Sequence, residues 1–211
     1  MKGRFITFEG TEGVGKSTQI ALAADHLRGR GIDPLVTREP GGTALAEKLR
    51  ALVLDAGHAP VSASAELLIM FAARASHVAE VIRPALGKGR WVVCDRFTDA
   101  TEAYQGGGRG VHAAWIRELA KIAHPRLWPD VTFLFDAPPE VAHARLAARA
   151  TGHDRIESEG ADFFERVRAG YLAIAAREPG RVRVVDATQG EREVAAQVAE
   201  VLDALLARER G

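Results

Sequence analysis

Residues 5–18 read Phe5-Ile6-Thr7-Phe8-Glu9-Gly10-Thr11-Glu12-Gly13-Val14-Gly15-Lys16-Ser17-Thr18. A short apolar run leads directly into the pattern G-x-x-x-x-G-K-[ST], and a helical pattern begins at Lys16. In such a loop, glycines let successive backbone N–H groups turn toward phosphate oxygens, while the following helix offers its positive end to the same anion. Residues 10–18 therefore predict a nucleotide phosphate site, with Lys16 at the β and γ phosphates and Ser17 helping to hold Mg²⁺.

Two other interpretations of these glycines are weaker. An ordinary glycine turn needs neither Lys16 nor Ser17. A dinucleotide site of the Rossmann type needs the spacing G-x-G-x-x-G, which this stretch lacks. The phosphate loop is therefore the preferred interpretation.

Outward from this stretch, short apolar runs alternate with longer segments of helical period, which predicts an α/β fold with a parallel sheet and helices on both faces. The expected strands are 5–8, 35–37, 91–94, 131–135 and 182–185. The expected helices are about 16–28, 44–56, 65–86, 113–123, 140–149, 161–176 and 193–208. The glycines at 106–108 are expected to separate elements. Segments 38–43 and 151–160 fit no regular element, and loops of this kind bind ligands when they follow the carboxyl ends of strands.

Composition narrows the class of protein. A chain of 211 residues has room for one α/β domain, and we expect residues 1–211 to form one. The 28 basic residues balance the 28 acidic residues, so the charge footprint of general nucleic-acid binding is missing. The single cysteine, Cys94, excludes an internal disulfide and a multi-cysteine zinc site. No apolar stretch approaches about 18 residues. We expect a cytoplasmic protein with no signal peptide and no nucleic-acid or membrane partner.

Asp95 and Arg96 follow the strand expected at 91–94, at the same edge as the phosphate loop if the sheet is parallel. Asp95 is placed to bind Mg²⁺ through water, with a structural ion pair as the alternative. Arg96 is placed to hold an anion with its planar guanidinium.

Arginines are frequent in the segments that are expected to border this edge of the sheet. They are Arg38, Arg74, Arg96, Arg109, Arg145, Arg149 and Arg155. Two bound nucleotides need this much positive charge, whereas a nucleotide switch or motor binds one. A switch also needs a base-reading motif such as N-K-x-D, which the chain lacks. The pattern favours a phosphotransferase, with residues 145–160 as a cover that excludes water.

Six segments together resemble bacterial thymidylate kinases, in the order of that family and over residues 6–189. They are Phe8-Glu9-Gly10-x-Glu12-Gly13-x-Gly15-Lys16, Thr37-Arg38-Glu39-Pro40-Gly41-Gly42-Thr43, Asp95-Arg96, Ala103-Tyr104-Gln105-Gly106-Gly107-Gly108-Arg109-Gly110, Asp154-Arg155-Ile156-Glu157 and Asp186-Ala187-Thr188-Gln189. The resemblance implies a P-loop kinase fold with five parallel strands. It also implies transfer of the γ-phosphoryl group of ATP to dTMP, giving dTDP and ADP for dTTP synthesis, with Mg²⁺ and usually as a homodimer.

The resemblance further implies a set of residues that bind dTMP. They are Glu12 at the sugar 3′-hydroxyl, Arg38 and Arg96 at the phosphate, Phe71 on the thymine ring, Arg74 and Thr101 at the edge of the base, Tyr104 at the sugar 2′ position, and Gln105. Without the resemblance, Phe71 and Tyr104 also fit core positions, and Glu12 also fits a solvated loop. Arg74 lies on the same helix face as Phe71, and a core face seldom carries an unpaired arginine.

One subclass of this family carries a basic residue inside the phosphate loop, and another carries it in the lid. Residues 11–14 contain none, so the chain resembles the second subclass. The resemblance then implies a lid at about 145–160, with Arg145 near the adenine or phosphates of ATP. Arg149 is the first candidate for the transition-state cation and Arg155 is the alternative, alongside Lys16 and Arg96 as catalytic residues. Residues 186–189 resemble the adenine-side loop.

Overall fold

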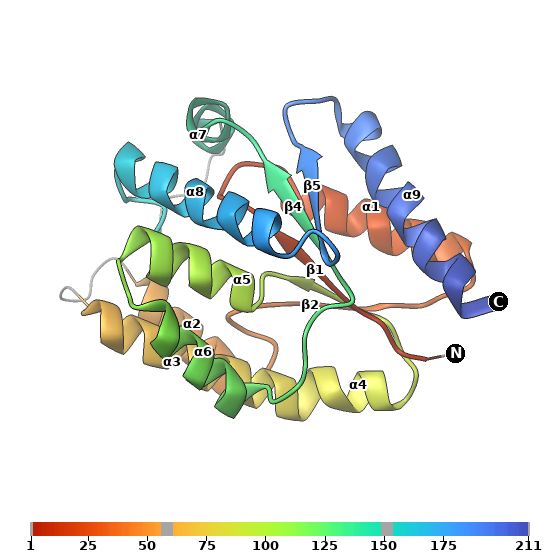
Figure 1. Cartoon of the computed structure of the whole chain (residues 1–211), viewed down its shortest axis with the longest axis horizontal. Coiled ribbons are helices and arrows are strands. Elements are labelled where there is room, and N and C mark those ends of the chain that lie inside the picture. Colours follow the sequence, from red (N-terminus) through yellow and green to blue (C-terminus); the bar gives the residue numbers. More distant parts are fainter. Residues whose placement is uncertain (1, 56–60, 149–153, 211) are drawn as a thin grey trace.

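Five parallel strands form the central sheet, in the order β2-β3-β1-β4-β5 (Figure 1). The structure is a computed structural model that describes residues 2–55, 61–148 and 154–210, without the side chains of 208–210. The strands are β1 (Phe5–Glu9), β2 (Leu35–Arg38), β3 (Val92–Asp95), β4 (Val131–Asp136) and β5 (Val182–Asp186). Each lies within one residue of its expected bounds, and the predicted five-stranded parallel sheet is confirmed.

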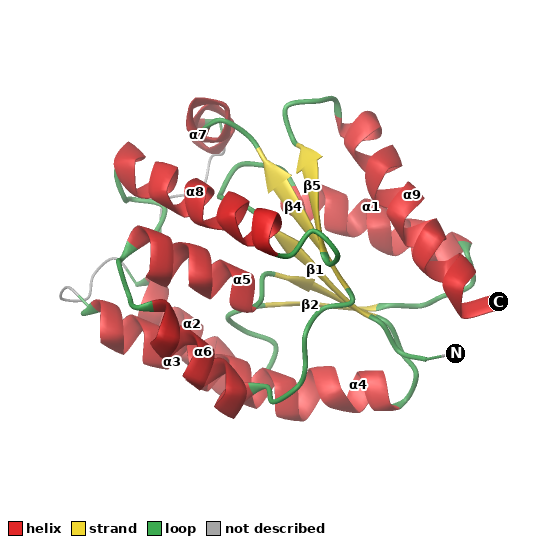
Figure 2. Ribbon diagram, in the orientation of Figure 1, coloured by secondary structure: helices red, strands yellow, loops and turns green. Residues whose placement is uncertain are grey.

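Helices cover both faces of this sheet (Figure 2). They are α1 (Lys16–Gly29), α2 (Ala44–Leu54), α3 (Ala63–His77), the π-helical η1 (Val78–Ile82), α4 (Arg83–Gly87), α5 (Thr98–Thr101), the π-helical η2 (Glu102–Gly108), α6 (Ala113–Ala123), α7 (Pro139–Ala147), α8 (Ala161–Arg177) and α9 (Glu191–Arg210). None of the helices in the described part of the chain combines the length and the apolarity needed to cross a membrane.

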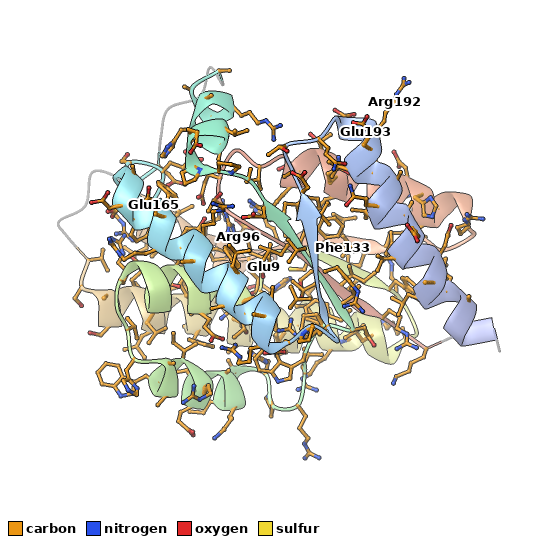
Figure 3. All side chains as sticks on the ribbon, turned by 45° about the horizontal axis from the view of Figure 1, so that its top comes forward. Glu9, Arg96, Phe133, Glu165, Arg192 and Glu193 are labelled. Carbon is orange, nitrogen blue, oxygen red and sulfur yellow. The ribbon has the colours of Figure 1, made fainter. Side chains whose placement is uncertain are left out.

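The alternating side chains of the strands build a core on each face. Ile6, Phe8 and Phe133 pack against apolar side chains of α1 and α9. On the other face, Phe5 packs against η1 and α4, while Leu134 packs against α8. Phe133 is fully buried and lies in the middle of the sheet (Figure 3). Central strands that are buried on both faces explain why their sequences are almost continuously apolar.

Glycines 106–108 are the last three residues of η2 and precede α6, so they separate two elements as expected. The helical stretch that they end, α5 to η2, was not predicted. A Cβ atom on Gly108 would lie 2.4 Å from the ring of Phe163 on α8. The glycines therefore allow two helices to approach closely. The expected helix 65–86 is confirmed as one helical stretch, α3 to α4, which begins at Ala63 because Ser62 accepts a hydrogen bond from the backbone of Ala65.

Parallel register brings the ends of the strands to one edge of the sheet. Phe8 pairs with Asp95, and Asp95 also lies opposite Arg38. The phosphate loop, the segment that begins at Arg38 and the Asp95-Arg96 pair therefore meet at the carboxyl edge, as the sequence predicts.

Candidate active site

The phosphate loop joins β1 to α1, and its backbone carbonyl groups contact the side chain of Lys16. Gly13 and Gly15 have φ values of 78° and 90°, which residues other than glycine rarely adopt. The ammonium of Lys16 donates hydrogen bonds to the carbonyl oxygens of Gly10 and Thr11, at 3.1 and 2.7 Å. Burial and the positive charge of Arg96 lower the pKa of Lys16 to about 8. An anion bound in the loop would favour the charged lysine, so the loop is suited to phosphate.

Arg96 connects the end of β3 to the phosphate loop. Its φ of 68° is left-handed, a strained backbone conformation for a residue with a side chain. The guanidinium donates to Glu12 Oε1 at 2.7 Å and to the Gly10 carbonyl at 2.9 Å, and it lies 4.9 Å from the centre of the Tyr104 ring. Tyr104 in turn donates its hydroxyl to Glu12 Oε2 at 2.6 Å. The structure thus brings together Glu12, Arg96 and Tyr104, which the resemblance assigned to one ligand.

Two residues of this network had no assigned role in the sequence analysis. Glu9 at the end of β1 accepts hydrogen bonds from the backbone N–H of Phe97 at 2.7 Å and from the hydroxyl of Tyr171 at 2.8 Å. Tyr171 on α8 accepts a hydrogen bond from Arg96 at 3.1 Å. Glu9 and Arg96 lie close together beneath α8 (Figure 3). A charged residue closing a buried strand was the available signal for Glu9, whereas Tyr171 looks like any core residue of a helix.

Three buried polar atoms near the predicted base site have no hydrogen-bond partner within the described ranges. They are Arg74 Nη1, Thr101 Oγ1 and Gln105 Oε1. Arg74 is otherwise fully engaged, since Nε donates to Glu39 at 2.6 Å and Nη2 donates to the Phe97 carbonyl at 3.0 Å. Buried polar atoms without partners are rare in native proteins. All three residues were predicted to bind dTMP, and each carries such an atom.

Of these three residues, Gln105 lines a cavity of about 70 Å³. Its lining residues are Glu12, Arg50, Leu54, Met70, Arg96, Ala100, Tyr104, Gln105, Asp154 and Ile156. Arg50 on α2 was not predicted, because nothing in the pattern of its helix distinguishes it from a surface arginine. Phe71 does not line this cavity. It packs among Leu67 and Ile116, with the Arg74 guanidinium 4.9 Å from its ring centre.

Arg38 lies apart from the cavity. Its guanidinium is half exposed and donates to both carboxylate oxygens of Glu47 on α2, at 3.0 and 2.8 Å. Glu47 also accepts a hydrogen bond from the Gly42 backbone. The pair holds the loop after β2 against α2, at the same sheet edge as Arg96.

A second cavity, of about 160 Å³, lies on the other side of the phosphate loop. Its lining residues are Val14, Gly15, Thr18, Gln19, Arg145, Ala187, Gln189, Glu191 and Val194. Arg145 on α7 donates to the Ala187 carbonyl at 2.7 Å and so joins α7 to the loop after β5. The phosphate loop thus separates two cavities. One is bordered by four of the residues predicted for dTMP, Glu12, Arg96, Tyr104 and Gln105, and the other by Arg145 and by residues of the loop predicted for the adenine side.

Asp95 and Ser17 have the character of partners for a hydrated cation. Asp95 Oδ1 is buried without a hydrogen-bond partner in the described structure, and Ser17 is exposed at the first turn of α1. Among the described residues, no group of three or more His, Cys, Asp or Glu side chains is arranged to hold a metal. These two residues therefore fit Mg²⁺, which keeps several waters and is held by few protein groups together with phosphate oxygens.

Of the two lid arginines, Arg155 lies within the described residues. Arg155 donates to Glu66 Oε2 at 2.5 Å and to the Val53 carbonyl at 2.8 Å, which anchors the described part of the lid to α3 and α2. Arg149 lies outside the described residues. The described part of the predicted loop, 154–160, contains turns and no helix or strand, as expected.

The buried carboxyl of Glu9 generates a prediction about pH. Burial, with a smaller effect of Asp99, raises the pKa of Glu9 from 4.5 to about 8. Between these values the folded protein binds more protons than the unfolded chain, so stability falls as pH rises. Across this range, the Glu9 contribution to the free energy of unfolding should fall by on the order of 1 kcal/mol per pH unit.

Urea denaturation at several pH values compares the wild type with Glu9→Gln, which removes the titration. Stability of the wild type should decline relative to Glu9→Gln as pH rises from about 5 to about 8. Glu200→Gln, at an exposed position of α9, should follow the wild type. Parallel curves for the wild type and Glu9→Gln would show that Glu9 does not titrate in this range.

Comparison with known proteins gives one consistent result. The thymidylate kinase family model matches residues 8–198. A thymidylate kinase of Ectopseudomonas mendocina is 52% identical over the full length of both chains, and one of Bordetella petrii is 54% identical over 97% of each. The crystal structure of thymidylate kinase from Ehrlichia chaffeensis superimposes with a TM-score of 0.78 at 32% identity, covering 96% of this chain and all of that one. This chain belongs to the thymidylate kinase family.

Proposed function

We propose that this protein transfers the γ-phosphoryl group of ATP to dTMP, giving dTDP and ADP for dTTP synthesis. The observation that carries the proposal is the position of Glu12 and Arg96. Both line the same cavity as Gln105, whose amide oxygen has no partner among the described residues, and Glu12 belongs to the phosphate loop itself. An acceptor bound there would present its phosphate directly beside the donor site, as in-line transfer requires. We propose that residues 1–211 act as one kinase domain.

On the donor side, residues 10–18 and Arg145 bind ATP in this proposal. Lys16 would exchange its two carbonyl partners for the β and γ phosphates, which is favourable because its charge is poorly compensated in the loop. Ser17 and Asp95 would hold Mg²⁺. Bound Mg²⁺ neutralises the charge on phosphate oxygens. The unpartnered, buried oxygen of Asp95 supports its part in this arrangement.

On the acceptor side, Arg96 binds the dTMP phosphate and Glu12 binds the sugar 3′-hydroxyl. Tyr104 limits space at the 2′ position, and its buried ring is held between Arg96 and α8. The remaining proposed contacts are Arg38 at the phosphate, Phe71 at the thymine ring, and Arg74, Thr101 and Gln105 at the edge of the base. Arg96 lines the acceptor-side cavity and contacts the phosphate loop at Gly10, so we assign it, with Lys16, to stabilising charge during transfer.

We assign the transition-state cation of the lid to Arg149. Arg155 already donates to Glu66 and to the Val53 carbonyl, and breaking these contacts would leave a buried carboxylate with one fewer partner. Arg155 is better suited to anchoring the lid. This supports the first of the two candidates from the sequence.

We also propose a homodimer in the cytoplasm, where ATP and deoxynucleotides are available. Its interface is an apolar face across α2, α3 and α6, which pack side by side. The exposed apolar side chains of this face are Leu45, Leu52, Leu68, Trp115 and Ile122. A monomer rarely exposes so many large apolar side chains on neighbouring elements.

The activity is tested with a panel of nucleoside monophosphates, ATP and Mg²⁺, by measuring diphosphate formation. We expect dTMP to be the preferred acceptor. Lys16→Ala should lower turnover by at least about 100-fold while the fold is retained, because phosphate charge is then uncompensated. Lys88→Ala, at an exposed turn after α4, is the matched control and should retain turnover. If phosphate were released from ATP at the same rate with and without a nucleoside monophosphate, the protein would instead be a hydrolase.

The assignment of the lid arginines is tested by steady-state kinetics. Arg149→Ala should lower turnover by roughly 10³ to 10⁵, with Michaelis constants little changed, as expected for a contact made in the transition state. Arg149→Lys should recover little, because an ammonium lacks the planar fork. Arg155→Ala should lower stability more than turnover. The roles would be exchanged if Arg155→Ala lost the turnover and Arg149→Ala kept it.

The dimer is tested by sedimentation velocity. Ile122 is 77% exposed on α6, so Ile122→Asp should leave the monomer folded but place a charge in the proposed interface. We expect the sedimentation coefficient to fall from that of a dimer to that of a monomer. Val184→Asp changes an equally apolar exposed side chain on β5, away from this face, and should leave the dimer intact. A wild-type protein that sediments as a monomer would refute the interface.

A further inference from the structure

Glu66 on α3 is a buried carboxylate to which the sequence analysis assigned no role. Its side chain is 1% exposed. Oε1 accepts hydrogen bonds from Gln105 Nε2 at 2.8 Å and from Arg109 Nε at 3.4 Å, while Oε2 accepts one from Arg155 at 2.5 Å. Gln105 and Arg109 come from the segment around η2, and Arg155 belongs to the lid. Glu66 therefore connects a predicted base-binding residue to two cations.

The charge on Glu66 determines which way the Gln105 amide is turned. Burial raises the pKa of Glu66, but hydrogen bonds from Gln105 and Arg155 and the charges of Arg109 and Arg155 outweigh it and lower the pKa overall. Glu66 is thus ionised at neutral pH. An ionised carboxylate only accepts hydrogen bonds, so the amide nitrogen of Gln105 must face it. The opposite orientation would place the amide oxygen against the carboxylate.

This orientation leaves the amide oxygen of Gln105 for a ligand. Gln105 Oε1 is buried and has no partner among the described residues, and Gln105 lines the cavity beside Tyr104 and Ala100. An amide oxygen accepts and cannot donate. Thr101, the neighbouring unpartnered hydroxyl, can do either and so cannot discriminate between bases.

An acceptor at this point selects among pyrimidines by their ring nitrogen N3. Thymine and uracil carry a hydrogen on N3 and donate it, whereas N3 of cytosine is an acceptor. We propose that Glu66 is a positioning residue for base selection: by fixing the amide of Gln105, it presents an acceptor that pairs with N3–H and repels cytosine. The proposal rests on dTMP being the acceptor substrate of this site.

The substitution Glu66→Gln changes this orientation without changing the size of the side chain. The amide of the substituted side chain has a single oxygen, which can take the position of either Oε1 or Oε2 of Glu66. Its NH₂ group cannot face Arg155 at the present distance of 2.5 Å, so the oxygen is expected to remain with Arg155. The NH₂ group then faces Gln105, whose amide turns and presents its own NH₂ group to the base. Thymine N3–H would meet a donor in place of an acceptor.

The test is kcat/KM for dTMP and dCMP with ATP and Mg²⁺. For Glu66→Gln we expect kcat/KM for dTMP to fall about 10- to 100-fold, mainly through KM, with a much smaller change for dCMP. The ratio of kcat/KM for dTMP to kcat/KM for dCMP therefore falls at least about tenfold. If Glu66 had a merely structural role, the substitution would lower kcat/KM by the same factor for both substrates. An unchanged ratio in a folded Glu66→Gln enzyme overturns the proposal.

Arg109→Gln is the matched control, because it removes one cation from Glu66 but leaves the contact with Gln105. Its dTMP to dCMP ratio should equal that of the wild type. In a Gln105→Leu background, Glu66→Gln should no longer change the ratio, since the two residues act through one contact. A ratio that still falls in this background would show that Glu66 acts by another route and would overturn the proposal.

A second measurement needs no variant at all. The wild-type enzyme is compared on dTMP and on N3-methyl-dTMP, in which a methyl group replaces the hydrogen on N3 and both carbonyl groups are kept. The analogue should lose about 10-fold or more in kcat/KM, because the amide oxygen then lacks its donor. Equal use of both would refute the inference while leaving the kinase activity in place. A wild-type enzyme that does not phosphorylate dTMP would instead remove the proposed function, and the inference with it.

Discussion

The organisation of the site depends on the strained backbone and the many contacts of Arg96. Its left-handed conformation at the end of β3 directs the guanidinium across the sheet edge to the phosphate loop. There it contacts the Gly10 carbonyl, Glu12 and Tyr171, which belong to the phosphate loop and to α8. One side chain thereby holds together three separate parts of the chain, namely the end of β3, the phosphate loop and α8. Strain of this kind persists only where surrounding contacts determine it, and the hydrogen bond from Phe97 to Glu9 supplies one of them.

Buried carboxyl groups orient the cations and amides of the site through hydrogen bonds. Glu9 supports Arg96 through Tyr171, Glu39 holds Nε of Arg74, and Glu66 holds Arg155 and Gln105. Among the described residues, Arg74 Nη1 beside Glu39 and Gln105 Oε1 beside Glu66 are left without a hydrogen-bond partner. Removing a charge from water is costly, and it is tolerated when the charge is paired and hydrogen-bonded. The arrangement therefore exchanges stability for side chains that are already oriented before a nucleotide binds.

Much of the fold followed from local pattern. The strands were predicted to within one residue because buried parallel strands are continuous apolar runs between helical segments. The helical stretch from α5 to η2 was not predicted, since glycines that permit close helix packing look the same in sequence as glycines in a turn. In the site, Lys16, Asp95, Arg96 and Tyr104 were found through motif and resemblance. Glu66, Arg50 and Tyr171 were not, because each lies on a helix where only its partners across space give it a role.

The sequence by itself determined the phosphate loop, the parallel sheet and the edge at which the loops meet, because these depend on short-range spacing and on the period of apolar residues. It also carried the resemblance that named the residues around dTMP. Only the tertiary structure decided how those residues are oriented. Glu66 lies 39 positions before Gln105 and 89 before Arg155, and the direction of the Gln105 amide depends on the charge that these distant residues share. Hydrogen-bond direction is a property of pairs in space, and no spacing along one chain encodes it.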